Sequence, residues 1–158
     1  MDYCIRPITE SEYPLLNDFL YEAIFVPQGV PAPPRSIIEL PELQVYVRDF
    51  GGGEADICFV AETGGRVVGA AWTRVMNDYG HIENGVPSLA ISLYEPHRGQ
   101  GIGTSLMRAV LAELKQRGYA KVSLSVQKAN AAVRLYRRLG FVTVRETDEE
   151  YLMVYYLR

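Results

Sequence analysis

Residues 94–114 read YEPHRGQGIGTSLMRAVLAEL, in which three glycines and an arginine fall within six positions and a periodic apolar run follows at once. The run predicts an amphipathic helix that ends near Gly118. Its apolar stripe consists of Leu106, Met107, Val110, Leu111 and Leu114. A helix N-terminus offers unpaired amides and a partial positive charge, and glycines let a ligand approach them closely. The segment RGQGIG, residues 98–103, is therefore either a flexible turn or a phosphate-binding loop.

Two common phosphate motifs do not match this loop. The dinucleotide pattern G-x-G-x-x-G requires glycine at the position of Thr104, and the P-loop requires a Gly-Lys-Ser/Thr tripeptide that the chain lacks. A kinase, a GTPase and a Rossmann dehydrogenase are therefore poor interpretations. The loop does match the pattern R-x-x-G-x-G from Arg98 to Gly103, between a predicted strand and a predicted helix.

Strand-like and helix-like stretches lie on both sides of the loop. Alternating apolar residues predict strands, and apolar residues three and four positions apart predict helices. Strands are expected over residues 2–8, 56–62, 66–76, 87–94, 121–126, 141–146 and 150–158, and helices over 9–25, 36–50, from the loop to Gly118, and over 130–140. The order β-α-α-β-β-β-α-β-α-β-β predicts one α/β domain over residues 1–158, with a mixed central sheet of six to seven strands flanked by four helices.

The two N-terminal helices carry the clearest boundary signals. Either Thr9 or Ser11 could cap the first helix. Ser11 is the better choice, because Pro14 then falls in the first turn, where no amide donor is needed. Ser36 is expected to cap the second helix, which is either continuous or broken at Pro41. Between the helices, residues 26–35 contain four prolines and predict an irregular, semi-stiff loop.

Composition argues against several classes of function. The net charge of −3 and the pI of about 5.4 disfavour nucleic acid as a partner, because phosphate binding needs a basic face. No apolar run approaches the roughly 18 residues that span a bilayer, so no membrane segment is expected. Cys4 and Cys58 form no C-x-x-C pair and are interpreted as two buried thiols of a cytoplasmic protein. Two widely spaced histidines do not favour a metal site.

A second motif lies about thirty residues after the loop. Residues 130–141 read NAAVRLYRRLGF. Together with the loop, this stretch resembles the GNAT family of N-acetyltransferases, whose motifs are Q/R-x-x-G-x-G/A and N-x-A-x-x-L-Y-x-x-x-G-F. The order of elements along the chain also agrees, so the resemblance implies a GNAT-like fold and acetyl-CoA as the cofactor. The family often has proline three residues before the loop arginine, whereas this chain has Glu95 there and Pro96 one place later.

The resemblance implies a set of cofactor-binding residues. The pantetheine arm is expected along the backbone of Ile91, Ser92 and Leu93, with an amide near Leu93 as the donor to the carbonyl oxygen. The pyrophosphate is expected on the loop residues Arg98, Gly99, Gln100, Gly101, Ile102, Gly103 and Thr104. Asn130 is expected to approach the cofactor, and Tyr136 to face the thioester sulfur and donate a proton to the departing thiolate.

The general base is less clearly indicated. An ammonium acceptor must lose a proton, and a carboxylate or histidine usually accepts it, directly or through water. Glu83 is the first candidate, followed by His81 and by Glu22 on the first helix. Each of them is also consistent with an ordinary surface charge, and a water relay without a single base is a further alternative.

The acceptor is expected to be a small-molecule amine or a peptide amine. The loop FVPQGVPAPPR, residues 25–35, is either a lid over that amine or plain structural packing. A rival function from another class is a non-catalytic acyl-CoA-binding sensor. The aromatic stretch 150–158 either pairs with a second subunit in a homodimer or forms ordinary core and edge.

Overall fold

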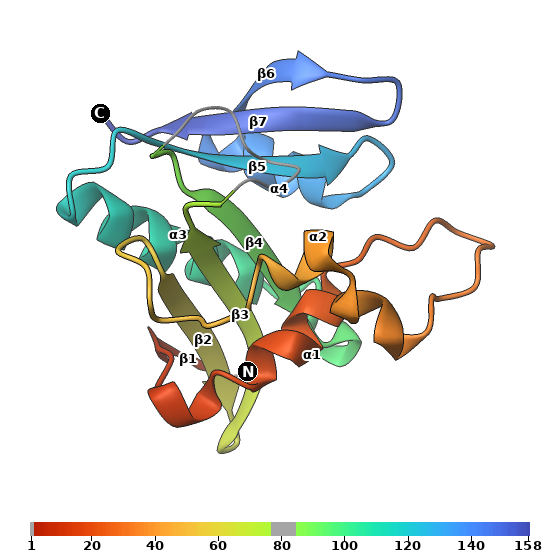
Figure 1. Cartoon of the computed structure of the whole chain (residues 1–158), viewed down its shortest axis with the longest axis horizontal. Coiled ribbons are helices and arrows are strands. Elements are labelled where there is room, and N and C mark those ends of the chain that lie inside the picture. The colour runs from red at the N-terminus through yellow and green to blue at the C-terminus, as the bar shows by residue number, and fades with distance from the viewer. Residues whose placement is uncertain (1, 77–84) are drawn as a thin grey trace.

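The computed structural model describes residues 2–76 and 85–158, in which seven strands form one mixed sheet (Figure 1). The strand order across the sheet is β1-β2-β3-β4-β5-β7-β6. Only β4 and β5 run parallel among the neighbouring strands described. The predicted α/β fold with a mixed sheet is thus confirmed. The strands are β1 (Cys4–Pro7), β2 (Ile57–Thr63), β3 (Arg66–Arg74), β4 (Ser88–Leu93), β5 (Lys121–Gln127), β6 (Val142–Glu146) and β7 (Glu150–Tyr156).

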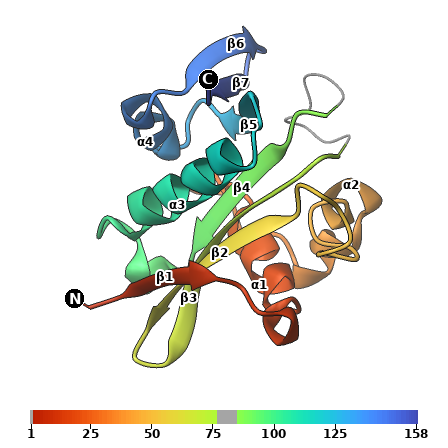
Figure 2. The ribbon, with the colours of Figure 1, turned by 90° about the vertical axis from the view of Figure 1, so that its left-hand side faces the viewer.

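Helices cover both faces of the sheet (Figure 2). Two of them, α1 (Leu15–Glu22) and α2 (Pro41–Gln44), lie on one face, and α3 (Ile102–Gln116) and α4 (Ala132–Leu139) lie on the other. Each layer packs its own apolar cluster against the sheet. The predicted apolar stripe of α3 is buried throughout, and Gly118 has the left-handed conformation typical of a helix end, with φ of 89°.

The first helix begins later than the sequence predicts. Residues Glu10–Glu12 form a separate 3-10 turn (η1), and α1 starts directly after Pro14. The turn is closed by the amide of Thr9, which donates to the Glu12 carboxylate at 3.0 Å. The expectation that Ser11 caps the helix is therefore wrong, because Thr9 and Glu12 form a reciprocal capping arrangement one turn earlier.

The second predicted helix is broken at Pro41. It consists of a 3-10 helix (η2, Arg35–Glu39) and the single turn of α2. Leu40 between them is extended, with φ of −59° and ψ of 137°, as residues before proline prefer to be. Pro34 precedes η2, so Ser36 lies within it rather than capping it.

The segment between α2 and β2 is fastened to the central strand β3. Trp72, the one tryptophan of the chain, is fully buried, and its Nε1 donates to the carbonyl of Tyr46 at 3.0 Å. Arg74 forms an ion pair with the buried carboxylate of Asp56 at 3.0 Å and donates to two carbonyls of the segment. These contacts hold residues 45–56 at the end of β3 that lies away from the glycine loop.

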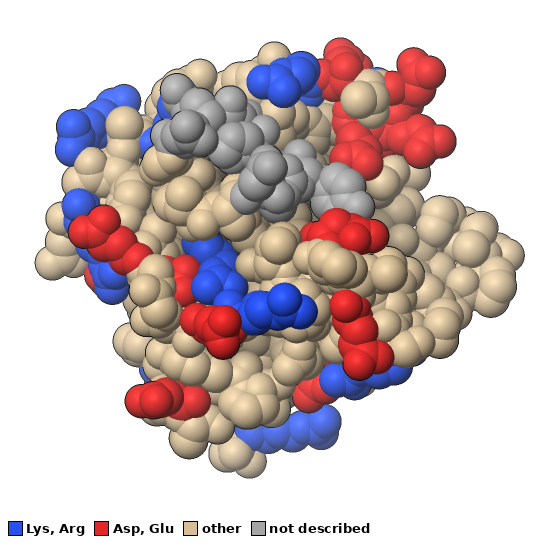
Figure 3. All heavy atoms as spheres, viewed as in Figure 1, with Lys and Arg blue, Asp and Glu red and all other residues tan. Residues whose placement is uncertain are grey.

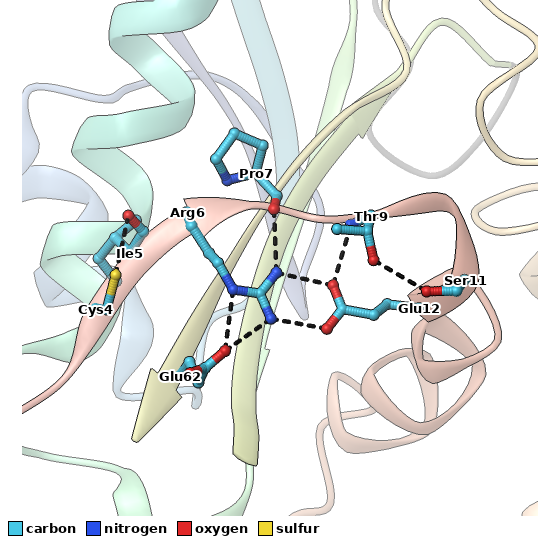
Figure 4. A network of polar contacts seen from close by, with 8 residues as sticks. All are labelled: Cys4, Ile5, Arg6, Pro7, Thr9, Ser11, Glu12 and Glu62. Carbon is cyan, nitrogen blue, oxygen red and sulfur yellow. Dashed lines mark hydrogen bonds and ion pairs between the residues drawn. The ribbon is translucent and has the colours of Figure 1, made fainter. Parts of the chain in front are cut away.

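Arg6 joins the first strand to its neighbours (Figure 4). Its Nη1 and Nη2 donate to the two carboxylate oxygens of Glu12 at 2.8 and 2.7 Å, and its Nε donates to Glu62 at 3.0 Å. The hydrogen bond from Arg6 lowers the pKa of Glu12 to about 2. This forked contact fixes β1, η1 and β2 relative to one another.

The parallel strands β4 and β5 meet at one point. The bridge joins Ser88 to Ser123, and the amide of Ser123 donates to the carbonyl of Pro87 at 3.0 Å. Beyond this bridge, the described parts of the two strands form no further ladder pairs, although β4 continues to Leu93 and β5 to Gln127. The sheet is therefore opened between β4 and β5 toward the carboxyl ends of both strands.

The last strand lies inside the sheet. β7 pairs with β5 on one side and with β6 on the other. It is therefore paired on both sides from Tyr151 to Val154 and forms part of the sheet of this chain. The expected homodimer stays a prediction. On this side of the sheet the edge strand is β6, whose five residues are all exposed, including Val142 at 48% and Val144 at 44%.

Cys58 is buried and Cys4 is exposed, and both are free thiols. The expectation of two buried thiols is therefore wrong for Cys4, which lies on the edge strand β1. Within the described residues, no helix has the length and apolar character needed to cross a membrane.

We expect Glu12→Gln to lower the free energy of unfolding near neutral pH by about 1 kcal/mol, the scale of a partly exposed ion pair. Folding lowers the pKa of Glu12 from 4.5 to about 2. Its contribution is therefore present above about pH 4.5 and is lost as the pH falls toward 2. Urea unfolding at neutral and at strongly acidic pH measures this difference.

The control for Glu12→Gln is Glu113→Gln, which removes the partner of Arg117 in an exposed pair on α3. We expect this control to change stability by a few tenths of a kcal/mol, the scale of a helical surface pair. An equal loss of stability in Glu12→Gln at both pH values would contradict the assigned role of the Arg6 contact.

Candidate active site

The backbone of β4 borders the gap between β4 and β5. The amide of Tyr94 donates to the carbonyl of Val68, directly opposite on the β3 side, at 3.0 Å. In an antiparallel ladder, alternate residues turn their amide and carbonyl away from the partner strand. By this alternation, Ile91 and Leu93 direct these groups away from β3 and toward the gap. They are suitably placed to pair with a peptide-like ligand.

Ser92 faces the opposite way. Its amide points toward β3 by the same alternation, and its buried hydroxyl donates to the carbonyl of Phe19 on α1 at 2.6 Å. Ser92 therefore couples β4 to α1 and contributes no backbone group to the gap. Its expected contact with the pantetheine arm does not fit this geometry.

The loop after β4 turns through two glycines before α3 begins. Gly99 and Gly101 have φ of 74° and 85°, in the left-handed region that glycine adopts without strain. Gly101 directly precedes α3, and a Cβ at this position would meet no atom within 4 Å. The amides of Ile102, Gly103 and Thr104 lie in the first helical turn and have no helical acceptor. This combination suits a phosphate group.

The other loop residues support this arrangement. The side chain of Gln100 donates to the backbone carbonyl four residues earlier at 3.0 Å. A Cβ at Gly103 would lie 3.6 Å from Leu135, 3.7 Å from Leu93 and 3.8 Å from Ile91. These are ordinary van der Waals distances, and they show that α3 begins close to half-buried apolar side chains of β4 and α4.

The side chain of Arg98 crosses the end of β4. Its Nε donates to the carbonyl of Leu93 at 2.9 Å, and its Nη2 forms an ion pair with Glu22 on α1 at 3.2 Å. The Arg98 side chain is 48% exposed. The sequence predicts Arg98 beside a pyrophosphate, whereas the structure places its guanidinium on the backbone of β4.

Asn130 and Tyr136 come from the other side of the gap. The Oδ1 of Asn130 accepts a hydrogen bond from the amide of Ala132, the first residue of α4, at 2.9 Å and thereby forms an Asx turn at the start of this helix. Tyr136 is 8% exposed, and its ring centroid lies 5.8 Å from that of Phe141. Burial raises the pKa of Tyr136 to about 12, and no charged or hydrogen-bonding neighbour among the described residues shifts it further.

Two of the three candidates for the general base, Glu83 and His81, lie outside the described residues. The third, Glu22, is the last residue of α1 and forms the ion pair with Arg98. Its side chain is 26% exposed. The predicted site therefore contains one described carboxylate near the end of β4, and that carboxylate has a cationic partner.

Sequence reasoning missed a polar group that lies beside Glu22. Asp18 is one helical turn before Glu22, and Tyr94 Oη donates to it at the long distance of 3.5 Å. Burial raises the pKa of Tyr94, and the charge of Asp18 raises it further. Arg35 forms an ion pair with Asp18. The i, i+4 spacing of the two acids on α1 was the available signal.

Tyr21 and Arg35 fasten the proline-rich loop to α1. The Tyr21 hydroxyl donates to the carbonyl of Pro33 at 2.6 Å, and the Arg35 guanidinium lies 5.8 Å from the centre of the Tyr21 ring. Residues 26–32 before these anchors are exposed, including Val30 at 52%. This part of the loop does not pack into the core, so it remains a candidate wall of an acceptor site.

Charges of both signs are mixed over the face shown in Figure 3, with acidic side chains gathered over the turn between β6 and β7. This turn contains Glu146, Asp148, Glu149 and Glu150. Among these acids, Glu146 forms an ion pair with Lys128 at 2.6 Å. The turn and the proline-rich loop lie on the same side of the molecule in Figure 1. An excess of negative charge there favours the approach of cations.

A cavity of about 640 Å³ lies elsewhere in the described part of the protein. Its lining includes Asp56, Arg74 and Tyr119. It lies where the last residue of β3 pairs with the first residue of β4, far from the glycine loop that follows β4. Neither the open edge of β4 nor Tyr136 contributes to this cavity. We therefore assign the site to the gap and the glycine loop.

Several curated proteins resemble part of the chain. A mycothiol acetyltransferase from Saccharomonospora viridis is 41% identical over 103 residues, which is 62% of this chain and 33% of that protein. N-acetyltransferase 8 from Rattus norvegicus is 32% identical over 108 residues, which is 68% of this chain and 46% of that protein. The matches therefore cover less than half of the length of these relatives.

Solved structures share the fold over nearly the whole chain. The ribosomal-protein-S18-alanine N-acetyltransferase from Escherichia coli has a TM-score of 0.68 and 21% identity, and the match covers 99% of this chain and 94% of that one. The PaiA N-acetyltransferase from Thermoplasma acidophilum, in complex with coenzyme A, has a TM-score of 0.67 and 16% identity, with 99% of each chain covered. At these identities the likeness concerns the fold.

The sequence itself carries the family signature. Residues 19–141 match the profile of the Acetyltransferase (GNAT) family. The matched span includes β4, the glycine loop, α3 and α4, which are the elements that border the gap. The chain therefore belongs to the Acetyltransferase (GNAT) family.

Proposed function

We propose that the chain is an N-acetyltransferase that moves an acetyl group from acetyl-CoA to an amine. The observation that carries this proposal is the open edge of β4, which leads from Ile91 and Leu93, through the short 3-10 turn η3 (Glu95–His97), into the glycine loop and the first turn of α3. A pantetheine arm is peptide-like and a pyrophosphate is anionic, so one extended cofactor matches both parts of this surface. We assign residues 1–158 to this one N-acetyltransferase domain.

Acetyl-CoA supplies an activated thioester when it is bound. In our proposal, the backbone groups of Ile91 and Leu93 hold its arm, and the amides from Gly99 to Thr104 hold its phosphates. Asn130 approaches the cofactor from the start of α4. An amide near Leu93 stabilises the negative charge that develops on the carbonyl oxygen in the tetrahedral intermediate.

Tyr136 is assigned as the general acid. A departing thiolate is stabilised by a proton or a hydrogen bond, and a neutral phenol provides either. Because burial raises the pKa of Tyr136 to about 12, the phenol is still protonated near pH 10, where about half of an alkyl amine is in the free form. Its position on the buried face of α4 supports this role.

The acceptor must lose a proton before it attacks, because an alkylammonium has a pKa of about 10. We assign Glu83 as the first candidate for this base, acting directly or through water. The acidic turn at residues 146–150 supports a cationic acceptor, either a small-molecule amine or the amine of a peptide. The exposed loop at residues 26–32 is the proposed wall of its pocket.

The proposed activity is tested by mixing the protein with acetyl-CoA and a panel of primary amines and peptides. We expect release of free thiol that requires both protein and acceptor, and an acetylated acceptor in the mass spectrum. Tight binding of acetyl-CoA without turnover on any acceptor would instead support a non-catalytic acyl-CoA sensor. A failure to bind acetyl-CoA would refute both functions.

Tyr136→Phe should lower kcat by about 100-fold while it changes the affinity for acetyl-CoA by less than about threefold, because it removes only the proton donor. The matched control is Tyr155→Phe, since both rings contact Phe141. The wild-type kcat should not fall near pH 10 through ionisation of Tyr136, whose pKa of about 12 keeps it protonated there. An unchanged kcat in Tyr136→Phe would refute the role of Tyr136 as general acid and leave it a packing residue.

Gly101→Asp should weaken the binding of coenzyme A by about tenfold or more, because its carboxylate would occupy the first-turn amides of α3 and repel the pyrophosphate. The position leaves open space for a side chain, but an aspartate there has to adopt the left-handed φ of 85°, so we expect a folded variant with a lower melting temperature. The affinity for dephospho-coenzyme A, which keeps the pyrophosphate, should fall by the same factor. Calorimetry measures both affinities.

The control for Gly101→Asp is Gly118→Asp, another left-handed position at the opposite end of α3. It should leave the affinity for coenzyme A unchanged. If Gly101→Asp is folded at the temperature of the measurement and binds coenzyme A as tightly as the wild type, the phosphate assignment is wrong.

A further inference from the structure

One guanidinium connects three parts of the candidate site. Arg98 belongs to the glycine loop, its Nε contacts the carbonyl of Leu93 on β4, and its Nη2 contacts the carboxylate of Glu22 on α1. Glu22 is 76 positions away in sequence, so this contact is a product of the fold. Arg98 therefore bridges the helix layer on one face of the sheet to the loop that precedes α3 on the other.

The contacted carbonyl lies on the path of the proposed cofactor. Leu93 turns its carbonyl toward the gap between β4 and β5, where we place the pantetheine arm. A donor at 2.9 Å puts the planar guanidinium at the end of β4. An arm that follows β4 to the glycine loop has to pass this point. Arg98 in its observed position and the arm therefore compete for the same place.

The position of Glu22 at the end of a helix favours a cationic partner for its carboxylate. It is the last residue of α1, and the partial negative charge at a helix C-terminus disfavours a carboxylate there. Its neighbour Asp18 already has Arg35 as a partner. Among the residues that the structure describes, Arg98 is the one ion-pair partner of Glu22. The carboxylate thus has a physical reason to hold Arg98 in the observed position.

A bound pyrophosphate can nevertheless replace Glu22 as the partner of the Arg98 guanidinium. Partly exposed ion pairs of this kind contribute a factor of about 1.4 to 5 in an equilibrium constant. Arg98 contacts Glu22 through one nitrogen at 3.2 Å, whereas arginine frequently binds phosphate through two parallel, charge-assisted hydrogen bonds. The 48% exposure of the Arg98 side chain leaves room for it to turn. The exchange of Glu22 for a pyrophosphate is therefore favourable, but the loss of the ion pair with Glu22 reduces the affinity for the cofactor.

We propose that Glu22 is a positioning residue that holds Arg98 across the end of β4 and competes with the pyrophosphate of the cofactor for its guanidinium. Binding of the cofactor then breaks the contact between α1 and the glycine loop. The inference rests on the proposed function. It adds a residue outside both sequence motifs to the control of cofactor affinity.

The test is a double-mutant cycle on the affinity for coenzyme A, measured by calorimetry on the full chain. Glu22→Gln should tighten binding about two- to fivefold, the factor expected when a partly exposed ion pair is removed. Arg98→Ala should weaken binding about tenfold, because a charge-assisted phosphate contact is lost. In the Arg98→Ala background, Glu22→Gln should have no further effect. Asp18→Asn, which removes a neighbouring charge paired with Arg35, should change the affinity by less than about 1.5-fold.

Three results would contradict the proposed competition between Glu22 and the pyrophosphate. An unchanged affinity in Glu22→Gln would overturn the proposed competition while the proposed function stands. Equal tightening with and without Arg98 would also overturn it, because the effect would then be a general repulsion between a carboxylate and an anionic ligand. If the wild type does not bind coenzyme A, the proposed function fails and the competition fails with it.

Discussion

The candidate site depends on one interrupted ladder. Ser88 and Ser123, both buried, form the single bridge between the parallel strands β4 and β5, and the strands diverge beyond it. Every other neighbouring strand pair described is joined over several residues, so each half of the sheet has its own hydrogen-bonded frame. Backbone amides and carbonyls need partners. A fold that separates two strands in its interior therefore creates a place where an extended, peptide-like molecule completes the sheet.

Local patterns in the sequence predicted the parts of the fold that local physics determines. The buried stripe of α3 and the helix end at Gly118 follow from residue types and from helical spacing alone. The sequence of strands and helices also followed from periodicity, and it was sufficient for the α/β architecture. The two motifs at residues 98–103 and 130–141 identified the elements that border the gap. Each motif includes an end of a helix and requires particular residues, such as glycine, at fixed positions.

Features that arise from contacts between distant segments were not predicted. The side of β4 on which Ser92 lies is set by the register with β3, which no local pattern reveals. The contact of Arg98 with Glu22 joins residues on opposite faces of the sheet. The position of β7 between β5 and β6 is likewise a matter of spatial order, since β6 precedes β7 in the chain but lies outside it. The start of α1 was missed for a local reason, because two hydroxyl residues competed and Thr9 had the better-placed partner in Glu12.

The buried position of Trp72 gives the protein a built-in optical probe. This indole is the one tryptophan in the chain, and it lies opposite Ala90 on β4, in the middle of the sheet. Because its side chain is fully buried among apolar residues, we expect its emission at short wavelength, with excitation energy transferred to it from the chain's 11 tyrosines. The other edge of β4 borders the gap. The natural fluorescence of the protein therefore originates one strand away from the candidate site and needs no attached dye.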